Sequence, residues 1–176
     1  MKKHHPALAI ATMLAAASPV FAHPWHIGQS LKSGAVHPLT GIDHILAAML
    51  VGIWAVRAPR SVRMIPMFCI AIFAAAVSPQ WLAERFADAA SIVCLALVGA
   101  LCVTGWKVPR IAAMTIVLSL ALFQGAAHSA AIAPGNDHLW FAIGLAATTA
   151  GISLVAATLT ALVQRGTSAS RASAPA

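Results

Sequence analysis

Five apolar runs separated by short polar breaks make up most of the sequence after residue 36. We place these runs at residues 37–56, 64–80, 88–106, 110–132 and 138–163. At a helical rise of about 1.5 Å per residue, each run can cross a hydrocarbon core of roughly 30 Å, the second run only just. The pattern therefore predicts an all-α fold, a polytopic membrane bundle of about five transmembrane helices within residues 23–165.

The breaks carry the charges and helix-ending residues expected between membrane spans. Residues 57–63 and 107–110 are basic, residues 84–88 hold both signs of charge, and residues 134–137 read Pro-Gly-Asn-Asp. Proline and glycine are typical of turns and loops. The breaks therefore agree with five separate spans.

The first 22 residues have the pattern of a cleavable signal peptide. A basic start at residues 1–5 is followed by an apolar stretch from Ala7 to Ala17, which is short for a membrane span. Val20 and Ala22 then occupy the positions where signal peptidase accepts small residues. We expect cleavage after Ala22, which leaves the mature N-terminus in the periplasm.

The basic residues give a second indication of orientation. With the N-terminus outside, the outer segments hold Lys32 and Arg85, whereas seven basic residues fall inside: Arg57, Arg60, Arg63, Lys107, Arg110, Arg165 and Arg171. Loops on the cytoplasmic side of membrane proteins are enriched in Lys and Arg. We therefore predict a multi-pass protein of the bacterial inner membrane with a cytoplasmic C-terminus. The Ser- and Ala-rich tail, residues 166–176, is expected to be disordered.

Composition excludes several classes of protein. The chain is 60% hydrophobic and 9% charged, whereas a soluble domain has about 25% charged residues. The partner of most of its surface is therefore the lipid bilayer. The net charge of +7 does not indicate a nucleic-acid partner, because the basic residues lie between apolar runs. Cys69, Cys94 and Cys102 lie in apolar stretches and are expected to be packing residues.

Polar side chains inside two of the runs require an explanation, because ionisable groups are costly in a bilayer. The first run contains His37, Asp43 and His44. If the run is helical throughout, the two histidines share a face, although Pro38 and Gly41 leave room for an irregular start. In the fourth run Gln124 and His128, four residues apart, also share a face. Both sets fall in the outer half of the predicted membrane. We therefore expect them to lie together.

Imidazole nitrogen and carboxylate oxygen suit divalent metals such as nickel, zinc and cobalt. Calcium is not favoured, because it prefers an all-oxygen shell. Asp43 could act as a ligand, or it could orient the ring of His44 from outside the metal shell. The sequence therefore predicts a transition-metal site.

Other functions stay open at this stage. His44 and His128 could be the axial ligands of a haem in an electron-transfer subunit, or the chain could bind metal without transporting it. His138, at the start of the fifth run, could equally be a packing residue. We find no nucleotide-binding loop and no visibly partnered nucleophile, so an enzyme is not expected.

Residues 37–49, His-Pro-Leu-Thr-Gly-Ile-Asp-His-Ile-Leu-Ala-Ala-Met, resemble the HupE/UreJ family of hydrogenase- and urease-associated nickel permeases. The family signature of this span, a His, five residues and then Asp-His, is intact. A second signature, Phe-His-Gly-x-Ala-His-Gly-x-Glu, survives in part at residues 123–131. Gln124 stands where the family has His, and Ala131 where it has Glu.

The resemblance implies an inner-membrane permease that carries Ni²⁺, with Co²⁺ as the second choice and no tightly bound cofactor. It implies hydrogenase or urease maturation systems as partners. By the same resemblance the metal ligands or path residues are His37, Asp43, His44 and His128, with Gln124 as a weaker candidate.

Overall fold

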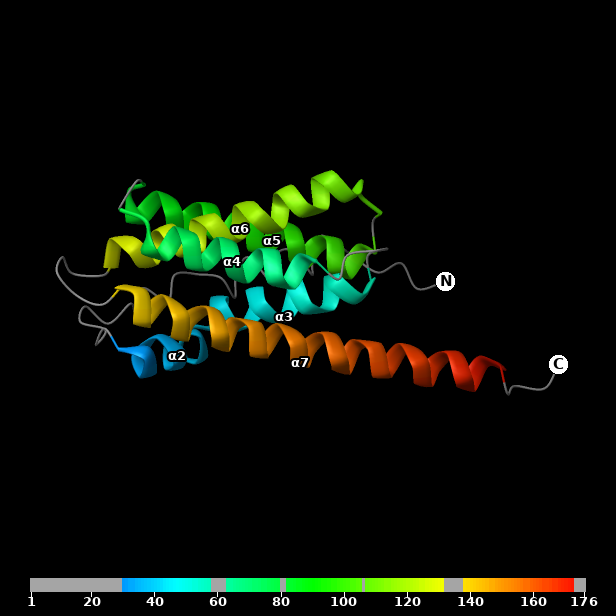
Figure 1. Cartoon of the computed structure of the whole chain (residues 1–176). Helices are drawn as coiled ribbons and strands as arrows, with labels where there is room; N and C mark the ends of the chain where they lie inside the picture. Colours follow the sequence, from blue (N-terminus) through cyan, green and yellow to red (C-terminus); the bar gives the residue numbers. More distant parts are fainter. Residues whose placement is uncertain (1–29, 58–62, 80–81, 106, 132–137, 173–176) are drawn as a thin grey trace.

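The computed structural model describes residues 30–57, 63–79, 82–105, 107–131 and 138–172, and the predicted all-α bundle is confirmed. The helices of this part of the chain are α2 (Leu31–Thr40), α3 (Ile42–Arg57), α4 (Met64–Val77), α5 (Glu84–Thr104), α6 (Arg110–Ala131) and α7 (His138–Ala172). Helices α3 to α7 run roughly along one direction (Figure 1), whereas α2 is bent by 84° from α3. The predicted signal peptide, residues 1–22, falls outside the described residues.

Three helices are long and apolar enough to cross a membrane, namely α5, α6 and α7. Helices α2 and α3 together are also long and apolar enough to cross a membrane, but the pair is bent by 84°. Helix α4 is apolar but has only 14 residues, about 21 Å at the helical rise. Within the described residues, the five predicted runs thus correspond to three candidate spans, one bent helix pair that is a fourth candidate, and one short apolar helix.

The first predicted run is not helical throughout, and the irregular start that Pro38 and Gly41 allow is found at Gly41. The helix begins at Leu31, six residues before the predicted start of the run at His37, and it breaks at Gly41. Gly41 is extended, with φ −105° and ψ 120°, so the chain leaves the helical path between Thr40 and Ile42. The hydroxyl of Thr40 donates to the carbonyl of His37 at 2.8 Å, which satisfies one carbonyl at the end of α2.

A serine pair sets the start of α2 outside the apolar run. The amide of Ser33 donates to the side chain of Ser30, and the amide of Ser30 donates to the side chain of Ser33. This reciprocal cap satisfies two amides that the first turn of a helix leaves unpaired. The polar cap explains why α2 extends beyond the segment that hydrophobicity alone indicates.

Helix α7 packs against both arms of the bent span. A Cβ on Gly34 of α2 would lie 2.0 Å from the carbonyl oxygen of Phe141, so the two backbones touch there. Further along, the hydroxyl of Ser153 donates to the carbonyl of Ala48 in α3 at 2.9 Å, beside a similar close approach at Gly52. Small residues permit this backbone contact between membrane helices.

The other helices complete the bundle around an apolar core. Helix α6 packs on α4 and α5, and the core includes Val51, Phe68, Val98, Val117, Leu120 and Leu145. As predicted, the cysteines lie in this core or against it, and all three are free. Large apolar residues also cover much of the outside, for example Ile70, Val93, Ile111 and Val163, as expected for a surface that faces lipid.

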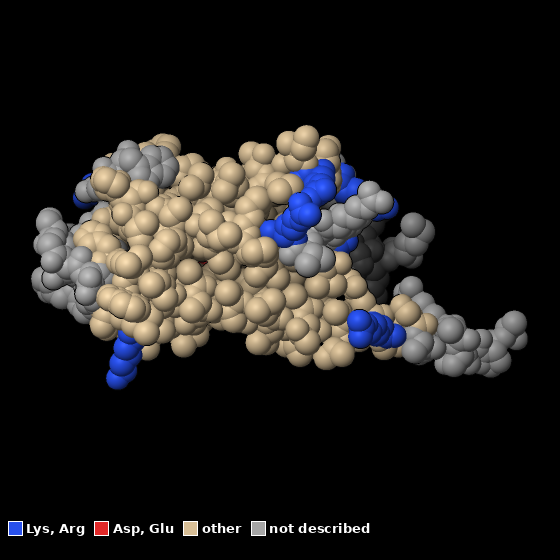
Figure 2. Space-filling model, in the orientation of Figure 1, with Lys and Arg blue, Asp and Glu red and all other residues tan. Residues whose placement is uncertain are grey.

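On the face shown in Figure 2, basic residues lie toward the two ends of the molecule, and none lies in the band between these ends. Arg57 closes α3 and donates to the carbonyl of Cys102 near the end of α5 at 2.8 Å. The charged ends of these helices therefore meet at one end of the bundle, in agreement with the predicted grouping of basic residues.

The prediction of a disordered tail from residue 166 differs from the structure, because α7 continues to Ala172. The hydroxyls of Thr167 and Ser168 both donate to the carbonyl of Gln164 at 2.9 Å. Because both hydroxyls bond to a carbonyl of the same helix, these polar residues are compatible with a helix that continues to Ala172. The last four residues, 173–176, lie outside the described part of the chain.

Candidate metal centre

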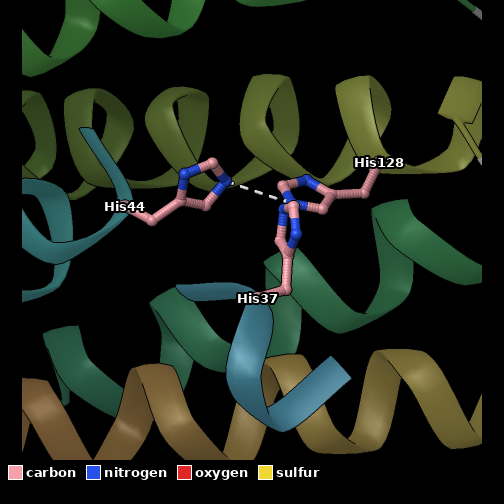
Figure 3. Close-up of side chains that lie close together, drawn as sticks. All are labelled: His37, His44 and His128. Atoms are coloured by element: carbon pink, nitrogen blue, oxygen red, sulfur yellow. Dashed lines mark hydrogen bonds between the residues drawn. The ribbon is translucent and has the colours of Figure 1, made fainter. Parts of the chain in front are cut away.

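Three histidines from three helices meet inside the bundle (Figure 3). His37 comes from α2, His44 from α3 and His128 from α6. Their exposed fractions are 7%, 8% and 2%, so all three are buried. One ring nitrogen of each can be chosen so that the three atoms lie within 4.8 Å of one another. Three buried imidazoles this close together form a group that could hold a metal ion.

The break at Gly41 brings the first two histidines together. Because the chain turns by 84° there, His37 approaches His44 from another direction and the rings meet edge to face, with centroids 5.1 Å apart. His128 completes the triangle, at 4.6 Å from His37 and 4.8 Å from His44. Phe141 of α7 lies 5.7 Å from His37 and gives the cluster an apolar wall.

Asp43 orients the ring of His44. Its Oδ2 atom lies 2.9 Å from Nδ1 of His44, and its side chain is 40% exposed. The carboxylate sits in the first turn of α3, where the helix dipole favours a negative charge. Because the carboxylate engages Nδ1, the other nitrogen of His44, Nε2, is directed into the cluster. This is the arrangement in which a carboxylate supports a histidine ligand from outside the metal shell.

The ring of His128 is oriented in the same way by the backbone. Its Nδ1 atom donates to the main-chain carbonyl of Gln124, one turn earlier in α6. A carbonyl oxygen only accepts, so Nδ1 carries the proton and Nε2 presents a lone pair. The Nε2 atoms of His44 and His128 form a hydrogen bond of 3.0 Å, so one of the two carries a proton in this structure. A metal cation that replaced this proton would be held by both lone pairs.

The structure therefore brings together three of the five predicted site residues. Asp43 contacts His44 beside the cluster, and Gln124 contributes its backbone carbonyl while its side chain is buried. His138 begins α7 and is not part of the three-histidine group. That these residues bind a metal stays a prediction.

Sequence reasoning did not identify two contacts of the cluster, the ring of Phe141 and the main-chain carbonyl of Gln124. Phe141 is one of several aromatic residues in apolar runs, and nothing in its position marks it as a neighbour of His37. The carbonyl of Gln124 belongs to the main chain, so no residue type indicates its role. The spacing of four between Gln124 and His128 was the available signal.

Comparison with known proteins agrees with this architecture. The family described as HupE / UreJ protein matches residues 11–175. Protein HupE of Rhizobium leguminosarum bv. viciae is 28% identical over 144 residues, which cover 78% of this chain and 75% of that protein. No solved structure matches. The family match covers nearly the whole sequence and confirms the resemblance seen at residues 37–49, so the chain belongs to the HupE / UreJ family.

Proposed function

We propose that this protein carries a divalent transition-metal ion, nickel first and cobalt second, across the bacterial inner membrane. One observation supports the proposal above all: three buried imidazoles from α2, α3 and α6 converge within 4.8 Å. Burying polar side chains among apolar helices is costly. A transported cation would explain why three of them lie in one place.

The donor atoms suit this class of ion. Imidazole nitrogens bind nickel, cobalt and zinc well, whereas oxygen ligands suit magnesium and calcium. Metal–nitrogen distances are about 2.1 Å, so two nitrogens 3.0 Å apart would subtend about 90° at a shared ion. Both nitrogens can therefore reach one ion, and imidazole coordination of this kind suits nickel, cobalt and zinc.

The third imidazole requires a small adjustment. Two nitrogens on opposite sides of one ion are at most about 4.2 Å apart, whereas the widest separation in the cluster is 4.8 Å. Closing this gap takes a movement of under about 1 Å by one ring, because each nitrogen must lie about 2.1 Å from the ion. A site that is not fully closed around its ion also suits a carrier, which must release what it binds.

The position of the cluster supports uptake from outside. In the predicted orientation the cluster lies toward the periplasmic ends of α3 and α6, and the partly exposed Asp43 would attract cations toward it. A membrane potential that is negative inside favours inward movement by about 2.3 kcal/mol per charge per 100 mV. Hydrogenase or urease maturation systems would use the delivered ion.

The geometry argues against the haem alternative. A haem held by His44 and His128 would need room for a porphyrin ring around its iron. The ring of His37 is centred 5.1 Å from that of His44 and 4.6 Å from that of His128, in space that a porphyrin would need. The cluster therefore suits a bare ion better than a macrocycle.

Uptake of radioactive nickel in a strain without its own nickel transporters tests the proposal. The wild-type chain should restore uptake, and His44→Ala and His128→Ala should abolish most of it. His138→Ala is the matched control, since it removes a histidine outside the cluster, and it should retain uptake. Equal uptake by all variants would contradict the proposal. Binding without transport in reconstituted vesicles would instead identify a non-transporting metal-binding protein.

A further inference from the structure

Gly41 is a glycine whose backbone does not require glycine. Its φ of −105° and ψ of 120° lie in the extended region that any L-residue adopts without strain. The bend between α2 and α3 therefore does not explain the absence of a side chain. The surroundings of the residue do.

A Cβ atom added to Gly41 would lie 2.6 Å from Nδ1 of His44 and 2.8 Å from Oδ1 of Asp43. Both distances are shorter than real Cβ contacts. The next nearest atom, Cε1 of His44, is 3.5 Å away, which is an ordinary contact. The space next to Gly41 is thus filled by the two side chains that pair with each other.

From this geometry we propose that Gly41 is a positioning residue, whose missing side chain leaves room for the pair between Asp43 and His44. The pair in turn directs Nε2 of His44 into the histidine cluster. The effect on cargo binding depends on the proposed function, whereas the effect on the pair itself does not. A methyl group at this position would push the ring or the carboxylate aside.

The same residue has a backbone role that a methyl group leaves intact. The carbonyl of Gly41 accepts from the amide of Ile45 at 3.1 Å and so begins the hydrogen-bond pattern of α3. Alanine keeps this carbonyl and can adopt the same dihedral angles. Gly41→Ala is therefore expected to move the two side chains while the break and both helices persist.

The matched control is Gly151→Ala in α7, because a Cβ there meets nothing within 4 Å. The pair is measured in the metal-free protein from the side-chain NMR signals of ¹⁵N-labelled histidine, with His44→Ala to assign His44. Wild type and Gly151→Ala should share one His44 Nδ1 signal, and Gly41→Ala should shift or lose it. Nickel affinity should fall by about 10- to 100-fold in Gly41→Ala, as for other changes that disturb the support of a ligand. Its melting temperature should match that of the control.

Combining Gly41→Ala with Asp43→Ala gives a further test. If Gly41 acts through the pair, the double variant should lose less affinity than the product of the two single losses. An unchanged His44 signal in Gly41→Ala, or fully multiplicative losses, would overturn the role of Gly41. If the wild-type protein moves no nickel and the His44 signal still shifts, the role of Gly41 holds and the transport proposal fails.

Discussion

The Nε2 atoms of His44 and His128 lie 3.0 Å apart, although 84 residues separate them in the chain. Each ring turns its Nδ1 toward an oxygen, the carboxylate of Asp43 in one case and the carbonyl of Gln124 in the other. Two different groups, a charged side chain and a backbone carbonyl, thus orient the two rings in the same way. The predictions below separate their contributions from those of helix packing.

Asp43→Asn should weaken nickel binding without abolishing it. The amide oxygen can still accept from Nδ1 of His44, but the negative charge that strengthens the ligand is lost. Such changes cost about 10- to 100-fold in affinity. Competition with a coloured chelator on purified protein measures the loss. The control is Asp88→Asn in α5, outside the cluster, which should bind as wild type does.

Gln124→Ala should leave nickel affinity within about twofold of wild type, because main-chain hydrogen bonds do not depend on the side chain. The carbonyl that holds His128 remains in the variant. The same competition assay measures the nickel affinity of this variant. A loss as large as that of His128→Ala would show that the amide side chain is itself a ligand, as the family resemblance suggests.

Gly34→Ala should destabilise the bundle. The added Cβ would lie 2.0 Å from the carbonyl oxygen of Phe141, so α2 and α7 must move apart. Overpacking of this kind costs about 1–3 kcal/mol. Thermal unfolding in detergent should show a lower melting temperature for Gly34→Ala than for Gly151→Ala. Alanine is favoured over glycine by a similar amount in both helices, but its Cβ meets no atom within 4 Å at position 151. Equal melting temperatures would contradict the close contact between α2 and α7.

Ser153→Ala should destabilise the bundle less than Gly34→Ala does. It removes the bond from Ser153 to the carbonyl of Ala48, and such interhelical bonds in membranes contribute about 0.6 kcal/mol on average. Thr158→Ala is the control, since the Thr158 hydroxyl bonds to Leu154 of its own helix. The free energy of unfolding, measured by denaturation in mixed micelles, should be lower for Ser153→Ala than for Thr158→Ala. The reverse order would show that the bond between α3 and α7 is not stabilising.

Hydrophobicity was sufficient to predict a bundle of membrane helices, because apolar runs of span length leave few alternatives. The convergence of His44 and His128 was also predictable, since their depths in the first and fourth runs match. Asp43 could be recognised as a ligand or as a support for His44, but the choice depends on a ring orientation that spacing does not determine.

The break at Gly41 was not predictable in detail. Pro38 and Gly41 allow an irregular helix, yet Pro38 lies inside α2 and the chain turns only at Gly41. The start of α2 was missed because its cap is a pair of serines outside the apolar run. Both features depend on local hydrogen bonds and packing, which a hydrophobic pattern does not encode.

Helix α7 contributes no histidine to the cluster, yet it is the main packing partner of α2 and also holds α3 through Ser153. The angle between α2 and α3 therefore depends on a helix that lies outside the group of donor residues. A chain cut after α6 would carry all three histidines but would lack the helix on which α2 rests. Possession of every donor residue is thus not sufficient for the cluster to assemble.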